Sequence, residues 1–293
     1  MKLFLLTLFA SFGFSLSNVL FTHFARKISS VLLVIIRGFW MCIFIFPFLF
    51  LIDLPLLDTT LSVLPKMLLG SAFTTVSIIL IMQSVKYLPV GAQHSIRSGL
   101  NLFWSVLLAT ILLKEYISLY QFIVLFIIIV LIFLLSYKKQ FFVHLSPKWH
   151  TGILLITIST LFLALGLYLI SQATKVIHPF LVGFAWEFSS TLFAALFYVS
   201  RHFIFPKHKI KKEINLKECG LLGLYALPAS LGSIAYVSAF ALGKYSTVRV
   251  ISTIGIGFTI LLGHLIFREK LSRSKLFLIL AIGLSISIFY LLK

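Results

Sequence analysis

The chain has 293 residues, of which 60% are hydrophobic and only 11% are charged, and its mean hydropathy is +1.12. A soluble protein of this length needs helices with a polar face, so this composition excludes a water-soluble globular protein. The formal net charge of +18 does not indicate nucleic-acid binding, because the Lys and Arg residues are spread over short loops, where they meet lipid head groups.

Ten apolar stretches follow one another almost from end to end, each close to the length of about 20 residues that a bilayer span requires. Hydrocarbon offers no partner to backbone groups, so each stretch must form an α-helix. The predicted spans are 2–22, 31–52, 66–86, 91–113, 117–137, 150–173, 179–200, 219–242, 246–267 and 273–292. The predicted fold class is therefore an all-α integral membrane protein with ten transmembrane helices.

A weak internal repeat divides these spans into two halves. Moving the sequence by 154 residues places 107–118 on 261–272 without a gap, so that Lys114-Glu115 falls on Arg268-Glu269. We predict a first five-helix repeat over 1–137, a connecting loop over 138–149 and a second five-helix repeat over 150–293. Five is an odd number, so the second repeat would be inverted in the membrane, and the substrate site of such folds lies between the repeats near the midplane.

Several short motifs resemble those of a known family. They are Phe12-Gly13 in the first span, Arg37-Gly38-Phe39 in the second, Lys114-Glu115 after the fourth, 243–250 at the start of the ninth and Arg268-Glu269-Lys270-Leu271 before the last. In these motifs, and in its ten spans, the chain resembles EamA-type members of the drug/metabolite transporter superfamily. The resemblance implies a carrier of small metabolites, often amino acids. Family members often carry a proline in the fourth and ninth spans; neither 91–113 nor 246–267 contains one, so the sequence holds no signal for a helix break there.

The fourth span has the best organised polar face. His94, Arg97, Ser98, Asn101 and Ser105 are three or four residues apart and therefore share one side of a helix. Exposed to lipid, such a stripe would be very unfavourable. One interpretation is hydrogen bonding between helices that holds the bundle together. We favour the other, a cavity wall for a polar substrate, because the guanidinium of Arg97 offers five donors.

Other ionisable residues within the spans are few. Glu187 is the one acidic residue deep inside a span, which makes it the sole candidate to carry a coupling proton, and we predict that it pairs with Arg37 or Arg97. Arg249 lies near the start of the ninth span, where its side chain can extend to the membrane surface. Polar or aromatic residues that are weaker candidates for substrate binding are Asn18, Gln83, Trp104, Tyr168, Trp186, Tyr236 and Ser252.

These patterns favour a secondary transporter that moves a small polar metabolite by alternating access, and they predict no enzymatic activity, cofactor or metal site. Three deep arginines against one glutamate favour an anionic or zwitterionic solute, such as an amino acid. The alternatives are a lipid or lipid-phosphate flippase and a membrane assembly factor that transports nothing. We expect a multi-pass protein of the cell (inner) membrane, as a monomer or a homodimer, whose partners are the lipid bilayer, a small molecule and protons.

The distribution of basic residues opposes the orientation that the resemblance implies, with both termini in the cytoplasm. In the loops and at the ends of the spans, six Lys and Arg lie on the side of the termini and sixteen on the other side. Basic residues in short loops favour the cytoplasm, so the count favours termini that face away from it. The sequence therefore leaves import and export open.

Overall fold

The computed structural model describes residues 1–25, 28–53, 57–84, 87–88, 90–136, 149–204, 215–268 and 271–292. Regular structure within these ranges is helical throughout. In chain order the helices are α1 (Lys2–Ala25), α2 (Ser30–Ile45), the 3-10 helix η1 (Phe46–Leu51), α3 (Leu57–Ser84), α4 (Val90–Leu112), α5 (Leu119–Ser136), α6 (Trp149–Ala173), α7 (Pro179–Ile204), α8 (Leu216–Leu242), α9 (Tyr245–Ser252), α10 (Gly255–Phe267) and α11 (Arg273–Leu291).

The ten predicted spans are confirmed. Within the described residues, eight segments are long and apolar enough to cross a membrane, and the shorter apolar segments Ile96–Leu112 and Leu119–Leu135 complete the set. Two spans differ from the prediction in detail. The third helix, α3, begins at Leu57 instead of residue 66 and continues through Pro65. The ninth span consists of two helices, α9 and α10, which places a break where the sequence gave no signal for one.

Local sequence explains where several helices begin. The Ser29 side chain accepts a hydrogen bond from the backbone N–H of Leu32 at the start of α2, and Ser272 has the same role at the start of α11. At the start of α8, Asn215 and Glu218 form a reciprocal capping box. Each cap satisfies N–H groups that have no partner in the first turn of a helix.

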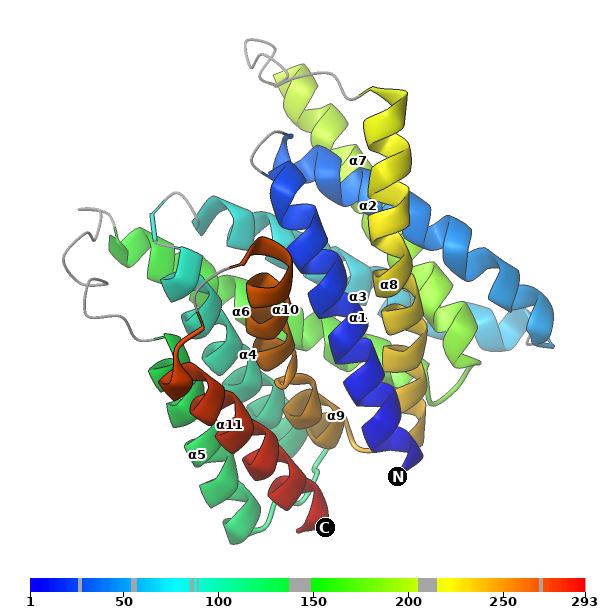
Figure 1. Ribbon diagram of the computed structural model, residues 1–293. Coiled ribbons are helices and arrows are strands. Elements are labelled where there is room, and N and C mark those ends of the chain that lie inside the picture. Colours follow the sequence, from blue (N-terminus) through cyan, green and yellow to red (C-terminus); the bar gives the residue numbers. More distant parts are fainter. Residues whose placement is uncertain are drawn as a thin grey trace.

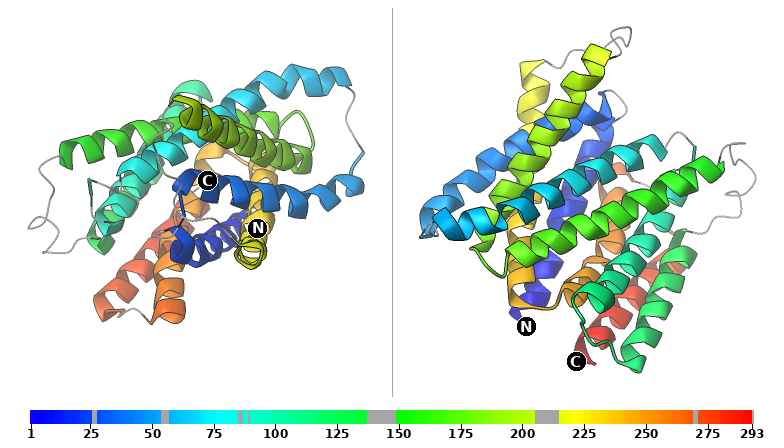
Figure 2. Two further views of the ribbon diagram at one scale, coloured as in Figure 1. Left: turned by 90° about the horizontal axis from the view of Figure 1, so that it is seen from above. Right: turned by 180° about the vertical axis from the view of Figure 1, so that it is seen from behind.

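The helices pack in a pattern that is unchanged when the two halves are exchanged. Helix α1 packs along α8 and α6 packs along α3, while α2 contacts α7 and α5 contacts α11. Helix α4 packs on α6, just as α9 and α10 pack on α1. Two repeats related by a two-fold axis produce such a pattern, and an odd number of spans in each repeat makes the second one inverted. In Figure 1 and in the view from behind in Figure 2, α1 lies beside α8 and both termini lie at the same end of the bundle.

Backbone geometry marks the same repeat. Lys114 and Arg268 have φ angles of 51° and 54°, and among the described residues they are the non-glycine positions with positive φ. This left-handed conformation is uncommon outside glycine and commonly ends a helix. The two residues are 154 positions apart, which is the offset found in the sequence. The connecting loop 138–148 lies outside the described residues, so the division at that loop stays a prediction.

Glycines allow close approach in the two central helix pairs. A Cβ atom on Gly166 of α6 would lie 2.7 Å from the carbonyl oxygen of Gly70 on α3. A Cβ atom on Gly232 of α8 would lie 3.1 Å from the carbonyl oxygen of Ala10 on α1. In a membrane, where apolar side chains gain little by leaving lipid, such close backbone contacts stabilise helix association. They also hold the first half against the second.

Candidate functional site

The break in the ninth span separates α9, which ends at Ser252, from α10, which begins at Gly255. Two serines of α1 direct their hydroxyls toward carbonyl groups at the break. Ser15 Oγ donates to the carbonyl oxygen of Gly255 at 2.9 Å, and Ser11 Oγ lies 3.5 Å from that of Ser252. Carbonyl groups freed by a helix break inside a membrane need donors of this kind. The break is thus held partly by a neighbouring helix, while the hydroxyls of Ser252 and Thr253 bond carbonyl groups from within the ninth span.

Arg249, in the last turn of α9, is fully engaged inside the bundle. Only 7% of its surface is exposed. Its Nε donates to Ser105 Oγ on α4 at 3.0 Å, and its Nη1 donates to the Tyr236 hydroxyl on α8. The Tyr245 hydroxyl, which also contacts Ser105, donates to the carbonyl oxygen of Ala164 on α6 at 2.9 Å. Arg249 therefore joins three helices, and the prediction that it extends to the membrane surface is wrong.

The polar face of α4 contains groups whose hydrogen-bonding capacity is not used. Arg97 is half-buried, and its guanidinium makes no hydrogen bond or ion pair with any residue that the structure describes. One turn further, Asn101 Oδ1 is buried without a partner, and so is Trp104 Nε1 in the next turn. Most buried polar groups in proteins are bonded, so three unused groups over two turns of one helix call for an explanation. Ser98 is half-buried beside them, and the side chain of His94 lies outside the described part.

Electrostatics distinguish this face further. The positive charges of Arg249 and Arg37 both act on Arg97, and no described carboxylate is near enough to offset them there. Like charges in a medium of low polarity repel strongly. The three arginines therefore form a zone of positive potential within the bundle.

A second polar cluster joins α1, α2, α7 and α8. Arg37 Nη1 donates to Asn18 Oδ1 at 3.0 Å, and the guanidinium carbon lies 5.6 Å from the centre of the Phe21 ring. Glu187 Oε1 accepts a hydrogen bond from Ser233 Oγ at 2.9 Å. Arg37 and Glu187 act on each other electrostatically, yet in the described part no nitrogen–oxygen distance within 4.0 Å joins them. The predicted partners are thus neighbours without a direct ion pair.

The remaining candidate residues are mostly engaged by the fold. Trp186 Nε1 donates to Thr74 Oγ1 at 3.2 Å and so ties α7 to α3. Tyr168 is half-buried and packs against the main apolar cluster. Ser252 Oγ donates to the carbonyl oxygen of Arg249, within its own helix, at 2.8 Å. Gln83 is exposed near the end of α3.

Glu115 is a key residue that was not among the predicted candidates. From the connection after α4, its Oε1 accepts the backbone N–H of Tyr245 at 2.8 Å, and its Oε2 accepts that of Ser246 at 3.0 Å as well as the Ser246 hydroxyl. The carboxylate therefore caps the N-terminus of α9, where it also complements the helix dipole. The Lys114-Glu115 motif marked this position in the sequence, whereas no sequence signal marks Ser233.

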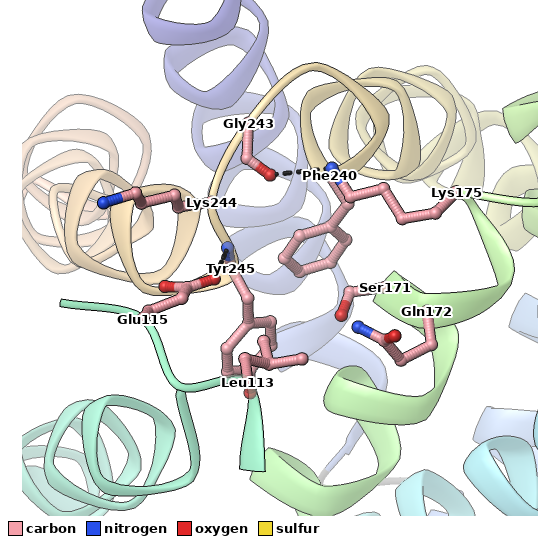
Figure 3. A pocket seen from close by; sticks show the side chains of 9 residues that line it. All are labelled: Leu113, Glu115, Ser171, Gln172, Lys175, Phe240, Gly243, Lys244 and Tyr245. Atoms are coloured by element: carbon pink, nitrogen blue, oxygen red, sulfur yellow. Dashed lines mark hydrogen bonds between the residues drawn. The ribbon is translucent and has the colours of Figure 1, made fainter. Parts of the chain in front are cut away.

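A pocket of about 400 Å³ lies beside this cap (Figure 3). Its lining residues are Leu113, Glu115, Ser171, Gln172, Lys175, Phe240, Gly243, Lys244 and Tyr245. Lys175 Nζ donates to the carbonyl oxygens of Ala241 and Gly243 at 3.3 and 2.9 Å, at the end of α8. Partial burial lowers the pKa of Lys175, and the nearby Glu115 carboxylate opposes that shift. The polar groups of this pocket thus secure helix ends on the side of the termini.

Comparisons with known proteins agree with this architecture. The model of the EamA-like transporter family matches residues 1–137. No curated protein matches the sequence. A protein solved by crystallography superposes with a TM-score of 0.75 at 13% identity, over 99% of this chain and 96% of the other. That identity is so low that the likeness concerns the fold alone. Residues 1–137 thus match the EamA-like transporter family, a family of carriers and not of enzymes, and the chain is a multi-pass integral membrane protein.

Proposed function

We propose that the protein is a secondary transporter for a small anionic or zwitterionic metabolite, and that α4 supplies the main wall of its substrate site. Family membership implies secondary transport. The observation that carries the substrate class is the unused guanidinium of Arg97, which lies in a zone of positive potential set by Arg37 and Arg249. A substrate carboxylate can accept two parallel hydrogen bonds from one arginine.

The groups next to Arg97 fit the rest of such a solute. Asn101 Oδ1 is a free acceptor and suits an ammonium or hydroxyl group, while Trp104 Nε1 is a free donor. A bound anion would also reduce the repulsion among the three arginines. In this proposal Arg97, Asn101 and Trp104 contact the substrate, whereas Arg249 and Tyr236 hold the surrounding helices in place. We place the transporter in the cell membrane.

The test is an uptake screen with the full chain reconstituted in liposomes. The panel contains amino acids, nucleotides and cationic drugs, each measured with and without a proton gradient. We expect saturable uptake of an anionic or zwitterionic compound. Arg97→Ala should reduce that uptake to the level of empty liposomes while expression and monodispersity stay near those of the wild type.

The matched control is Arg201→Ala, which removes the same charge from an exposed position near the end of α7. Its uptake should equal that of the wild type. An unchanged rate for Arg97→Ala, or uptake restricted to cationic drugs, would count decisively against the proposal. Movement of labelled lipid between leaflets, with no uptake of soluble compounds, would favour a flippase instead.

A further inference from the structure

Among the described residues, Glu187 is the one carboxylate far from both ends of its helix, and its surroundings are unusual for a charged group. Within the described part of the chain, the Ser233 hydroxyl is the single hydrogen-bond donor to its side chain. No cation lies within ion-pair distance of it there. Glu187 is half-buried, and a carboxylate that stays charged away from water normally accepts several donors or pairs directly with a cation. This geometry therefore suits a carboxyl group that carries a proton.

Arg37 is the nearby cation, and it is bound elsewhere. One nitrogen donates to Asn18 on α1, and the guanidinium lies over the ring of Phe21. Its Nε is buried and has no partner among the residues that the structure describes. Arg37 thus retains an unused donor while its charge acts on Glu187 across the gap between them.

We propose that Glu187 is a proton-binding site and that its occupancy decides which partner Arg37 takes. With the proton bound, the carboxyl group is neutral, Ser233 is its partner and Arg37 stays with Asn18. When the O–H bond breaks and the proton leaves to water, the carboxylate becomes negative and draws Arg37 away from Asn18. The arrangement described above is that of the protonated form.

The groups around Glu187 do not offer another explanation. On α2, the facing titratable groups are Arg37 and the thiol of Cys42. Helix α8 faces it with the Ser233 hydroxyl, and α3 meets α7 through Thr74 and Thr75, whose hydroxyls contact Ser190. Among the described residues, no charged group of α6 or η1 acts on the carboxylate. A proton or Arg37 is therefore what can neutralise it.

The change of partner by Arg37 would also affect the proposed substrate site at Arg97. The charge of Arg37 acts on Arg97 as well as on Glu187. Movement of Arg37 toward Glu187 would therefore lower the positive potential at Arg97 and weaken the binding of an anion. Coupling of the proton to solute movement rests on the proposed transport function, whereas the proton site itself does not.

Infrared difference spectroscopy of the full chain in liposomes, without any solute, tests the proton site. Raising the pH from about 5 to about 9 should remove the carbonyl stretch of a protonated carboxylic acid, beyond the range of exposed Asp and Glu. Glu187→Gln should abolish this band. Asp53→Asn is the matched control because Asp53 is exposed after η1, and it should leave the band unchanged.

A second variant tests the role of Arg37 while Glu187 stays in place. In Arg37→Gln, no cation stabilises the charged carboxylate, so the band should persist to a pH higher by about one unit or more. A band that survives Glu187→Gln, or a titration that Arg37→Gln does not move, would overturn the inference. A proton site without solute uptake would sink only the transport proposal. Solute uptake by a protein that lacks this band would sink only the proton site.

Discussion

The fourth span and the ninth span are mates in the repeat, yet they place an arginine in opposite situations. Arg249 in α9 is buried and bonded to Ser105 and Tyr236. Arg97 in α4 has no bond to any described residue. In the sequence both are simply arginines inside an apolar span. The contrast teaches that burial of a charge in a membrane does not identify a ligand site; unused hydrogen-bonding capacity is the better criterion.

The fourth and ninth spans also differ in the continuity of their backbone. Helix α4 is continuous over Val90–Leu112, whereas its mate is broken between Ser252 and Gly255. Short α9 is fixed at its start by Glu115 and near its end by Arg249. The ninth span therefore uses its polar residues to hold an irregular backbone, whereas the fourth span, among the described contacts, leaves Arg97, Asn101 Oδ1 and Trp104 Nε1 without a partner.

The largest difference in stability is expected between substitutions of the two arginines. Arg249→Ala removes two charge-assisted hydrogen bonds between helices and should lower the free energy of unfolding by about 2 to 3 kcal/mol. Arg97→Ala removes no bond and relieves repulsion, so it should change stability by less than about 0.5 kcal/mol in the unfavourable direction. Thermal unfolding in detergent micelles, followed by circular dichroism, measures both. Equal destabilisation by the two substitutions would mean that Arg97 is structural as well.

The cap on α9 should be the next largest contribution. Glu115→Ala leaves the N–H groups of Tyr245 and Ser246 without their acceptor and should cost about 1 to 2 kcal/mol. Amide hydrogen exchange should become faster over Tyr245–Ser252 and stay unchanged in α4. Glu115→Gln keeps an acceptor oxygen but loses the charge, so it should recover part of the protection.

Glu218→Ala is the matched control for this cap. Glu218 belongs to the capping box of α8, so its removal should increase exchange at the start of α8 and leave α9 protected. Faster exchange over the whole chain in Glu115→Ala would show a general loss of stability instead of a local cap.

The parts of this molecule that could be predicted are those that depend on local sequence. Hydrocarbon imposes helices on every apolar stretch, so the ten spans follow from composition alone. The offset of 154 residues was visible in the amino-acid sequence. It reappears in the backbone conformation, because Lys114 and Arg268 both have positive φ angles. The polar face of α4 could also be predicted, because helical spacing alone places Arg97 and Asn101 on one side of the helix.

The parts that could not be predicted depend on which helices are neighbours. The break in the ninth span was not predicted, because the span has no proline and one of the donors that support the break, Ser15, belongs to α1. The sequence around Arg249 does not indicate that its side chain donates a hydrogen bond to Ser105, which is far away in the chain. Glu187 was predicted to pair with Arg37 or Arg97, but among the described residues Ser233 is the hydrogen-bond partner of Glu187 and Asn18 that of Arg37. A sequence does not distinguish two charged residues that form an ion pair from two that are only close to each other.

The smallest effect concerns the serines of α1, and it tests whether the break is truly held from outside the ninth span. Ser15 donates to Gly255 at the break, whereas Ser17, also buried on α1, has no partner for its hydroxyl. Ser15→Ala should therefore cost about 1 kcal/mol, because the Gly255 carbonyl group loses a donor. Ser17→Ala removes a polar group that no bond compensates, so stability should stay the same or rise slightly. Thermal unfolding of the two variants side by side gives the sign of each change, and faster amide exchange across 253–258 should accompany Ser15→Ala alone. Equal effects would mean that the break is set within the ninth span itself, and the contrast between the fourth and ninth spans would then lie in their own sequences after all.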